Sequence, residues 1–152
     1  LRQPILTATE GHAVISPRFT GYEPWKGELV PKRNGALIAM ETGTSIAYSI
    51  DKLQDRGKFF VEPMEEIYAG QVIGEHTKQD DLVINVIKTK KLTNMRASGS
   101  DEKVSIAPAT KFSLEEALEY VGENEYVEVT PKSIRLRKIL LSEHDRKREN
   151  KS

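Results

Sequence analysis

The side chains of this sequence that are best suited to chemistry are the cations of one polar stretch, residues 88–100. The stretch holds four cations and no acid before Asp101, namely Lys88, Lys90, Lys91 and Arg96. Hydroxyl and amide groups stand among them, at Thr89, Thr93, Asn94 and Ser98. Ammonium, guanidinium and small polar groups are those that contact phosphate and ribose oxygens. They predict binding of a nucleic-acid backbone, although a solvated surface loop explains a run of charge as well.

The same stretch indicates which kind of nucleic-acid contact to expect. No aromatic residue occurs between Lys88 and Lys111, so the loop itself supplies no ring for base stacking. Cations combined with small polar groups suit recognition of the backbone and shape of structured RNA.

A second basic set lies near the C-terminus and consists of Lys132, Arg135, Arg137 and Lys138. The alternation of residue types over 133–137 predicts a strand with two apolar side chains on one face. Arg135 and Arg137 share the other face. Two interpretations remain open. The set forms a flat cationic surface that joins the loop in RNA binding, or it is the polar face of an edge strand, where Lys and Arg discourage edge pairing.

No catalytic pattern accompanies these cations. The three histidines, His12, His76 and His144, are scattered and lack metal-ligand spacing. Cysteine is absent, and no phosphate-binding loop, serine-hydrolase motif or zinc-protease motif occurs. We expect no catalytic site, no metal and no cofactor in this chain. An enzyme remains an alternative, and it requires glutamates and His76 to converge in a cleft.

The net charge of zero conceals a segregated pattern. Residues 81–112 hold six Lys and Arg against three acids, residues 113–129 hold none against six, and residues 130–152 hold eight against three. Two basic segments therefore flank an acidic one, and such segregation creates local fields. No apolar run is long enough for a membrane helix, and no signal peptide is visible. Because the chain begins at Leu1, we interpret it as part of a longer protein.

Apolar runs and turn residues predict the elements that position the cations. Runs at 36–40 and 45–50 around Gly43 predict a hairpin, and Asp51 is the expected cap of a short helix that ends at Gly57. Further strands are expected at 58–62, 67–68, 72–76 and 82–87, and the last of these leads into the basic stretch. Residues 5–8 are expected to end a helix, and 12–15 to form a strand.

A helix is predicted after the basic stretch. Ser113 and Glu116 have the spacing of a capping box, and Gly122 ends the helix. Its expected apolar face consists of Leu114, Ala117, Leu118 and Val121. Strands at 126–129 and 133–137 follow, and Ser142 with Asp145 begins a last basic helix or a frayed tail. Together the elements predict a strand-rich α+β fold with a long basic loop, held at its ends by the strand at 82–87 and the helix at 113.

Several long motifs resemble the TypA/BipA family of bacterial translational GTPases. The most specific is KKLTNMRASG at 90–99, followed by Asp101 and Glu102. The others are LQDRG at 53–57, YAGQVIGEH at 68–76, VEVTPKSIRLRK at 127–138, PWKGE at 24–28 and RNG at 33–35. The resemblance runs along essentially the whole chain without gaps in its motifs.

The resemblance implies a domain organisation and a partner. Residues 1–27 correspond to the tail of a fifth domain like that of elongation factor G, and residues 28–152 to the family's C-terminal domain. A GTPase domain that binds GTP and magnesium is implied for the parent protein. The implied partners are the ribosome, through large-subunit RNA, and the acceptor arm of the A-site tRNA. The implied role is ribosome docking in the cytoplasm, linked to stress adaptation and large-subunit assembly.

Carried over by position, the basic stretch is the part expected to meet tRNA. The expected RNA-binding residues are Lys88, Lys90, Lys91, Thr93, Asn94, Arg96, Ser98, Lys132, Arg135, Arg137 and Lys138. We expect a monomer without membrane contact. A protein-docking module, whose cationic strand face binds an acidic protein, is the alternative from another class.

Overall fold

The computed structural model describes residues 5, 7–14, 16–22, 33–89 and 104–151. The chain divides into two compact units, Leu1–Pro31 and Lys32–Ser152. In the first unit the backbone is helical at Ile5, Thr7 and Ala8, as predicted, and the Thr9 hydroxyl donates to the Ile5 carbonyl oxygen at 2.7 Å. Residues 12–14 form no strand, so that part of the prediction is wrong. The predicted boundary between residues 27 and 28 lies outside the described residues.

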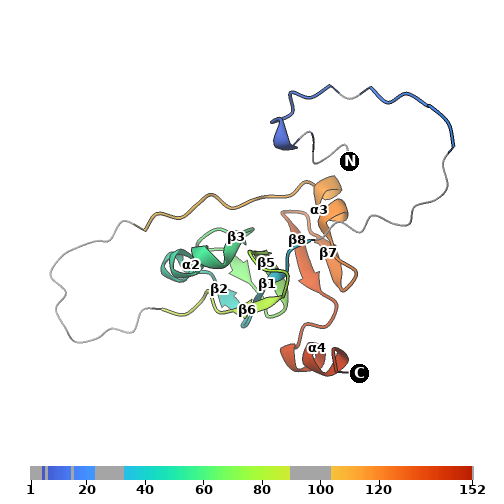
Figure 1. Cartoon of the computed structure of the whole chain (residues 1–152). Helices are drawn as coiled ribbons and strands as arrows, with labels where there is room; N and C mark the ends of the chain where they lie inside the picture. The colour runs from blue at the N-terminus through green and yellow to red at the C-terminus, as the bar shows by residue number, and fades with distance from the viewer. Residues whose placement is uncertain (1–4, 6, 15, 23–32, 90–103, 152) are drawn as a thin grey trace. The chain divides into compact units, whose positions relative to one another are not determined.

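The described part of the second unit is built around a six-stranded sheet (Figure 1). Its main path runs β6 (Leu82–Ile84), β1 (Ala36–Ala39), β5 (Gln71–His76), β8 (Ile134–Lys138) and β7 (Glu125–Val129). β5 is the central strand. One edge pairs with β1, and the other is shared between β8 and β3 (Gly57–Phe59). A separate pair joins β2 (Gly43–Thr44) to β4 (Glu66–Ile67). In the part of the chain that the structure describes, strands and helices mix without βαβ repetition, which confirms the predicted α+β class.

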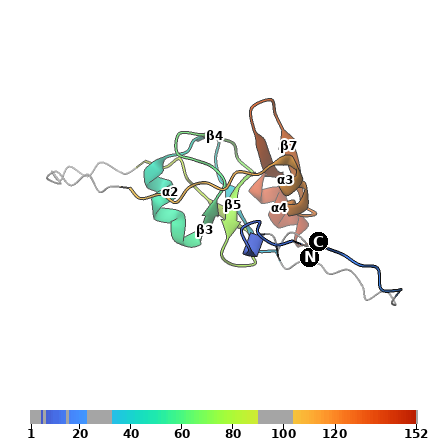
Figure 2. The same ribbon diagram turned by 90° about the horizontal axis from the view of Figure 1, so that it is seen from above.

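Each face of the sheet carries its own apolar cluster. Alternation along β1 sends Leu37 and Ala39 into one cluster and Ala36 and Ile38 into the other. The first cluster is covered by α2 (Ala47–Leu53), which contributes Ile50, and the second by α3 (Leu114–Tyr120), which contributes Ala117. Figure 2 shows these two helices on opposite sides of β5.

The predicted hairpin of residues 36–40 and 45–50 is wrong, because the second run begins α2 instead. Ile50 is completely buried and Leu53 packs against the same cluster, so the helical spacing of three residues puts both on one face. Tertiary burial thus overrides the β-branched composition of the run. The helix starts before Asp51, and the 3-10 turn Gln54–Arg56 then ends at Gly57 as predicted.

The capping box of α3 is confirmed. The Glu116 amide donates to the Ser113 hydroxyl at 3.3 Å, and the Ser113 amide donates to the Glu116 carboxylate at 2.8 Å. The predicted buried face is only partly right. Ala117 is buried and Val121 packs on the cluster, but Leu114 is 39 % and Leu118 59 % exposed.

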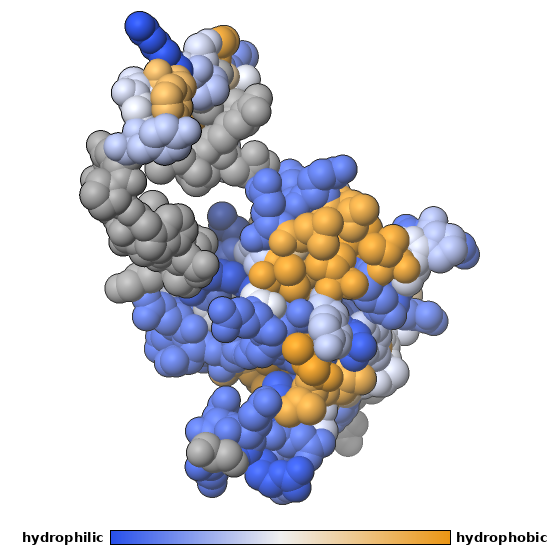
Figure 3. All heavy atoms as spheres, turned by 90° about the vertical axis from the view of Figure 1, so that its right-hand side faces the viewer, coloured by the Kyte–Doolittle hydropathy of each residue, from blue (hydrophilic) through white to orange (hydrophobic). Residues whose placement is uncertain are grey.

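The helix is turned because Tyr120 takes the inward position. Its ring lies 5.5 Å from Phe60 and 5.0 Å from Phe112, measured between centroids. Leu114 and Leu118 therefore face outward, and apolar surface is visible on the side of the molecule that carries α3 and β7 (Figure 3).

The remaining elements agree with expectation in place but differ in length. The strands expected at 58–62 and 82–87 are limited to β3 and β6, while β7 and β8 each lie within one residue of their expected bounds. The basic C-terminal segment forms α4 (Glu143–Glu149) after Ser142. Among the residues that the structure describes, no helix has both the length and the apolar character needed to cross a bilayer.

Replacing Ser113 with alanine is expected to lower the free energy of unfolding by about 1 kcal/mol, because the capping hydrogen bond to the Glu116 amide is lost. Ser142→Ala is the matched control, since Ser142 precedes α4 in the same way but its side chain makes no capping hydrogen bond. Urea-unfolding curves of both variants measure the difference. Equal destabilisation of the two would contradict the capping role of Ser113.

Candidate nucleic-acid interface

Most of the predicted basic loop lies outside the described residues. This applies to Lys90, Lys91, Thr93, Asn94, Arg96 and Ser98, so their expected contacts stay predictions. Lys88 and Thr89 are described and exposed to solvent. The structure therefore shows how the residues on either side of this segment are held, and not the segment itself.

Both flanks of the undescribed segment 90–103 are bonded to the same helical region. On the entering side, the Ser49 hydroxyl of α2 donates to the Lys88 carbonyl oxygen. On the leaving side, the Gln54 amide donates to the Ser105 carbonyl oxygen at 2.8 Å and accepts from the Ala107 amide at 2.9 Å. The expectation that the helix at 113 holds the second end is thus corrected, because Gln54 binds the chain several residues earlier.

This arrangement adds two residues that the sequence analysis missed. Tyr48 and Lys52 of α2 line a shallow hollow together with Asn85, Lys88 and Thr89. The Lys52 ammonium lies 5.7 Å from the centroid of the Tyr48 ring. An aromatic ring therefore stands at the base of a loop that has none of its own. No local pattern could have found it, since Tyr48 and Lys88 are forty positions apart in the sequence and line the same hollow only in the folded chain, where the neighbouring Ser49 binds Lys88.

The second basic set is divided by the structure. The alternation in β8 is as predicted: Leu136 is buried in the second cluster, whereas Arg135 and Arg137 lie on the opposite face. In the backbone register of β7 and β8, Arg135 stands opposite Glu128, and Arg137 stands opposite Tyr126. The Arg137 guanidinium lies 5.4 Å from the Tyr126 ring centroid. Lys132 is exposed in the turn between the two strands.

Glu128 limits the positive charge of this face and is itself bound. The Tyr68 hydroxyl donates to its carboxylate at 2.7 Å. Burial, together with the Glu128 charge, raises the pKa of Tyr68, so the phenol remains a donor at neutral pH.

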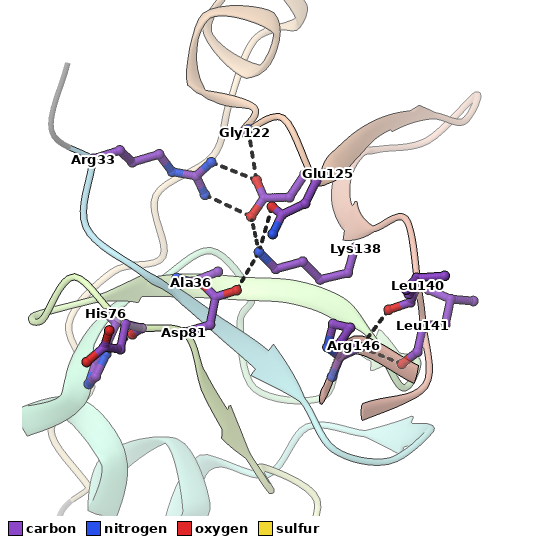
Figure 4. Close-up of polar contacts among 12 residues, drawn as sticks. Arg33, Ala36, His76, Asp81, Gly122, Glu125, Lys138, Leu140, Leu141 and Arg146 are labelled. Atoms are coloured by element: carbon purple, nitrogen blue, oxygen red, sulfur yellow. Dashed lines mark hydrogen bonds and ion pairs between the residues drawn. The ribbon is translucent and has the colours of Figure 1, made fainter. Parts of the chain in front are cut away.

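Lys138 does not belong to the exposed cationic surface, which corrects the expectation for this residue. Its side chain lies on the same, inward face of β8 as Ile134 and Leu136, and the residue is 2 % exposed. Its ammonium binds the Asp81 carboxylate at 2.6 Å and the Glu125 carboxylate at 2.8 Å (Figure 4). A buried ammonium requires such partners, so its charge is used inside the protein.

Arg33 completes this buried charge network. Its guanidinium binds Glu125 through two bonds of 2.7 and 3.2 Å and lies 4.0 Å over the Tyr120 ring. The Gly122 amide donates to Glu125, and the Ala36 amide donates to Asp81 (Figure 4). Burial alone would raise the pKa of Glu125, but the hydrogen bonds and charges of Arg33 and Lys138 outweigh it and hold that pKa below its usual value.

A further cation of the C-terminal segment is also engaged. The Arg146 guanidinium of α4 donates to the Leu140 and Leu141 carbonyl oxygens at 2.7 Å each. Of the two alternatives for this segment, the helix is the one observed, and the charge of its Arg146 is used within the protein.

The histidines are not gathered with acids into a candidate metal site within the described ranges. No group of three or more His, Asp or Glu side chains is placed there to hold a metal ion. His76 is 6 % exposed, and its ring Nδ1 lies 2.5 Å from the Asp80 carbonyl oxygen, so it is a packed group bonded to its own turn.

Comparison with known proteins identifies similar sequences. A family model described as the TypA/BipA C-terminal domain matches residues 34–143. The chain is 45 % identical over 152 residues to a protein of Haemophilus influenzae named large ribosomal subunit assembly factor BipA. Proteins with the same name from Salmonella typhimurium and Escherichia coli K12 are 46 % and 44 % identical. Each alignment covers 99 % of this chain and 25 % of the relative, so the chain spans about a quarter of the length of these relatives.

Substituting Lys138 with methionine is expected to destabilise the fold by about 3–5 kcal/mol, because Glu125 stays buried with one cation removed. Arg137→Met on the same strand is the matched control. Its guanidinium forms no ion pair among the described residues, and a change below about 1 kcal/mol is expected. Chemical unfolding of both variants tests this. Similar losses in both would show that the buried pairs do not matter.

The network also predicts a pH dependence. The folded-state pKa of Glu125 lies below its ordinary value of 4.5, so its contribution to stability is complete above that value and is lost as pH falls through the folded-state pKa. The free energy of unfolding is expected to decrease from about pH 5 downward. Glu125→Gln should reduce this slope, whereas Glu115→Gln on the exposed face of α3 should leave it unchanged. An unaltered slope in Glu125→Gln would exclude this carboxyl as its source.

Proposed function

This chain belongs to the TypA/BipA family, whose C-terminal domain it contains, and on that premise we propose that it docks a ribosome-associated factor on RNA. The relatives' printed name, large ribosomal subunit assembly factor, supports the large subunit as the partner. The cations of residues 88–96, with Lys132, Arg135 and Arg137, are the proposed RNA-binding groups.

The observation that carries the proposal is the double attachment of the four-cation segment to α2 and the 3-10 turn that follows it. Ser49 of α2 binds one flank and Gln54, the first residue of the 3-10 turn after α2, binds the other, so both flanks are held by the helical region that packs on the first cluster. A segment anchored at both ends on a rigid element loses less conformational freedom on binding than a free tail. Lys52 and Tyr48 extend the surface next to Lys88.

The proposed mechanism is electrostatic capture followed by positioning. Lys88, Lys90, Lys91 and Arg96 neutralise phosphates and release counterions, which makes the affinity fall as salt rises. Thr93, Asn94 and Ser98 set the register by hydrogen bonds to phosphate and ribose. Where the segment leaves the folded domain, Tyr48 offers one ring on which an unpaired nucleotide base can stack.

We extend the proposal to the finer partners that the family resemblance implies. These are large-subunit RNA and the acceptor arm of the A-site tRNA, met by a monomeric chain in the cytoplasm. GTP binding and hydrolysis, with magnesium, belong in this proposal to the part of the longer relatives that the chain does not span. Docking then serves large-subunit assembly and adaptation to stress.

The triple variant Lys90→Ala, Lys91→Ala, Arg96→Ala tests the docking role. Sedimentation of the chain with large ribosomal subunits at stepped salt is expected to show weaker binding. The slope of log affinity against log salt should fall by about 2–3, since each lost phosphate contact removes about 0.7–0.9. The matched control removes three cations that are exposed elsewhere on the domain, Arg56, Lys58 and Lys78. It changes net charge equally, and its binding should be nearly unchanged.

Protein-free large-subunit RNA separates the proposal from the protein-docking alternative. Binding to that RNA, weakened by the triple variant, supports RNA docking. Binding only to particles that retain their proteins, with equal loss in both triple variants, would replace it by docking on an acidic protein.

A further inference from the structure

A cavity of about 630 Å³ opens beside the turn between β7 and β8, and neither Ser49 nor Gln54 lines it. We propose that it binds one unstacked RNA nucleotide, with the base against its apolar wall and the phosphate at Lys132 and Arg135. The inference rests on the proposed RNA docking and adds a specific subsite to it. The volume lies within the range of about 300–1,000 Å³ that is usual for small-molecule sites.

The inner wall is apolar and partly aromatic. Phe60 and Phe112 meet edge to face with centroids 4.8 Å apart, and Val72, Ile134 and Leu136 continue the wall. These residues belong to the second core cluster or pack against it, so the wall is rigid. A rigid apolar wall receives the flat face of a base without a large loss of side-chain freedom.

The rim is cationic. Of the charged residues that line the cavity, three are cations (Lys111, Lys132 and Arg135) and one is an acid, Glu65, which leaves a net charge of +2. Lys111 is already paired with Glu65 at 2.8 Å. Lys132 and Arg135 form no ion pair with any residue that the structure describes. The buried Nε of Arg135 likewise lacks a hydrogen-bond partner there. Arg135 lies on the opposite face of β8 from Leu136, yet it also borders the cavity. The unpaired positive charge of Lys132 and Arg135 favours an anionic group at the rim.

Two further features favour a nucleotide over a simple anion. The turn holding Lys132 is fixed by bonds between Thr130 and Ser133, including 2.9 Å from the Ser133 amide to the Thr130 hydroxyl. Gln71 lines the cavity although it is only 2 % exposed. Its Oε1 accepts from the Tyr68 amide at 3.2 Å, whereas its Nε2 donates to no described residue. That amide is thus an unused donor on a residue that lines the cavity, of the kind that a carbonyl or ring nitrogen of a base accepts from.

Nuclear magnetic resonance of the ¹⁵N-labelled chain tests the site with three probes, which are inorganic phosphate, a nucleoside 5′-monophosphate and a single-stranded RNA trinucleotide. Saturable shifts at Gln71, Lys132 and Arg135 are expected with the trinucleotide and the monophosphate. Both should bind at least about tenfold more tightly than phosphate, because only they engage the apolar wall.

Lys132→Ala and Arg135→Ala should each weaken the trinucleotide about tenfold, the effect of one charge-assisted contact. Lys58→Ala is the control, an exposed cation outside the cavity, and should change nothing. Equal binding of phosphate and trinucleotide would reduce the cavity to an anion site and overturn the proposal. Binding of the monophosphate alone would assign it to a free nucleotide and overturn the RNA assignment.

The two proposals fail separately. If the chain sediments with large subunits but the cavity residues do not respond to the trinucleotide, the subsite is wrong and docking stands. If the trinucleotide binds in the cavity while subunits and their RNA do not bind the chain, docking is wrong and the nucleotide site stands.

Discussion

Four charged side chains meet where β7 and β8 approach the segments that lead into β1 and β6. Lys138 and Glu125 are almost completely buried, and buried charges are tolerated only when opposite charges and hydrogen bonds replace water. Their partners, Arg33 and Asp81, come from distant parts of the chain. The network forms only when the β7–β8 hairpin lies in one register against the rest of the sheet, since a shift would leave a buried charge unpaired. This constraint fixes the position of β8.

The position of β8 then decides what the basic residues can do. With Lys138 turned inward, alternation places Arg135 and Arg137 on the other face, and the turn of the hairpin carries Lys132 to the rim of the cavity. The basic segment after β6 depends on the opposite side of the sheet, where Ser49 of α2 and Gln54 of the 3-10 turn after it bind its two flanks. The two proposed RNA-binding regions are therefore positioned by different parts of the domain: one by the β7–β8 hairpin, the other by the helical region on one face of the sheet.

Short sequence patterns predicted the structure correctly where an element depends on contacts between residues that are close in the sequence. The capping box at Ser113 and the alternation of β8 are both determined within a few residues, and both are observed. Prediction failed where burial is decided by distant partners. Residues 45–50 have a strand-like composition, yet Ile50 enters the core from a helix. The face of α3 was misassigned because Tyr120, which packs on Phe60 and Phe112, displaced Leu118 from the interior.

The sequence by itself determined the α+β class, the family and the presence of two basic regions, because composition, periodicity and long motifs are properties of the chain alone. Only the tertiary structure decided which cations remain available. It buried Lys138 against two carboxylates, bound Arg146 to backbone oxygens, and left Lys132 and Arg135 beside an apolar cavity. It also brought Tyr48 to Lys88. The physical reason is that a charge is free or satisfied according to what packs around it, and those partners are far away in the sequence.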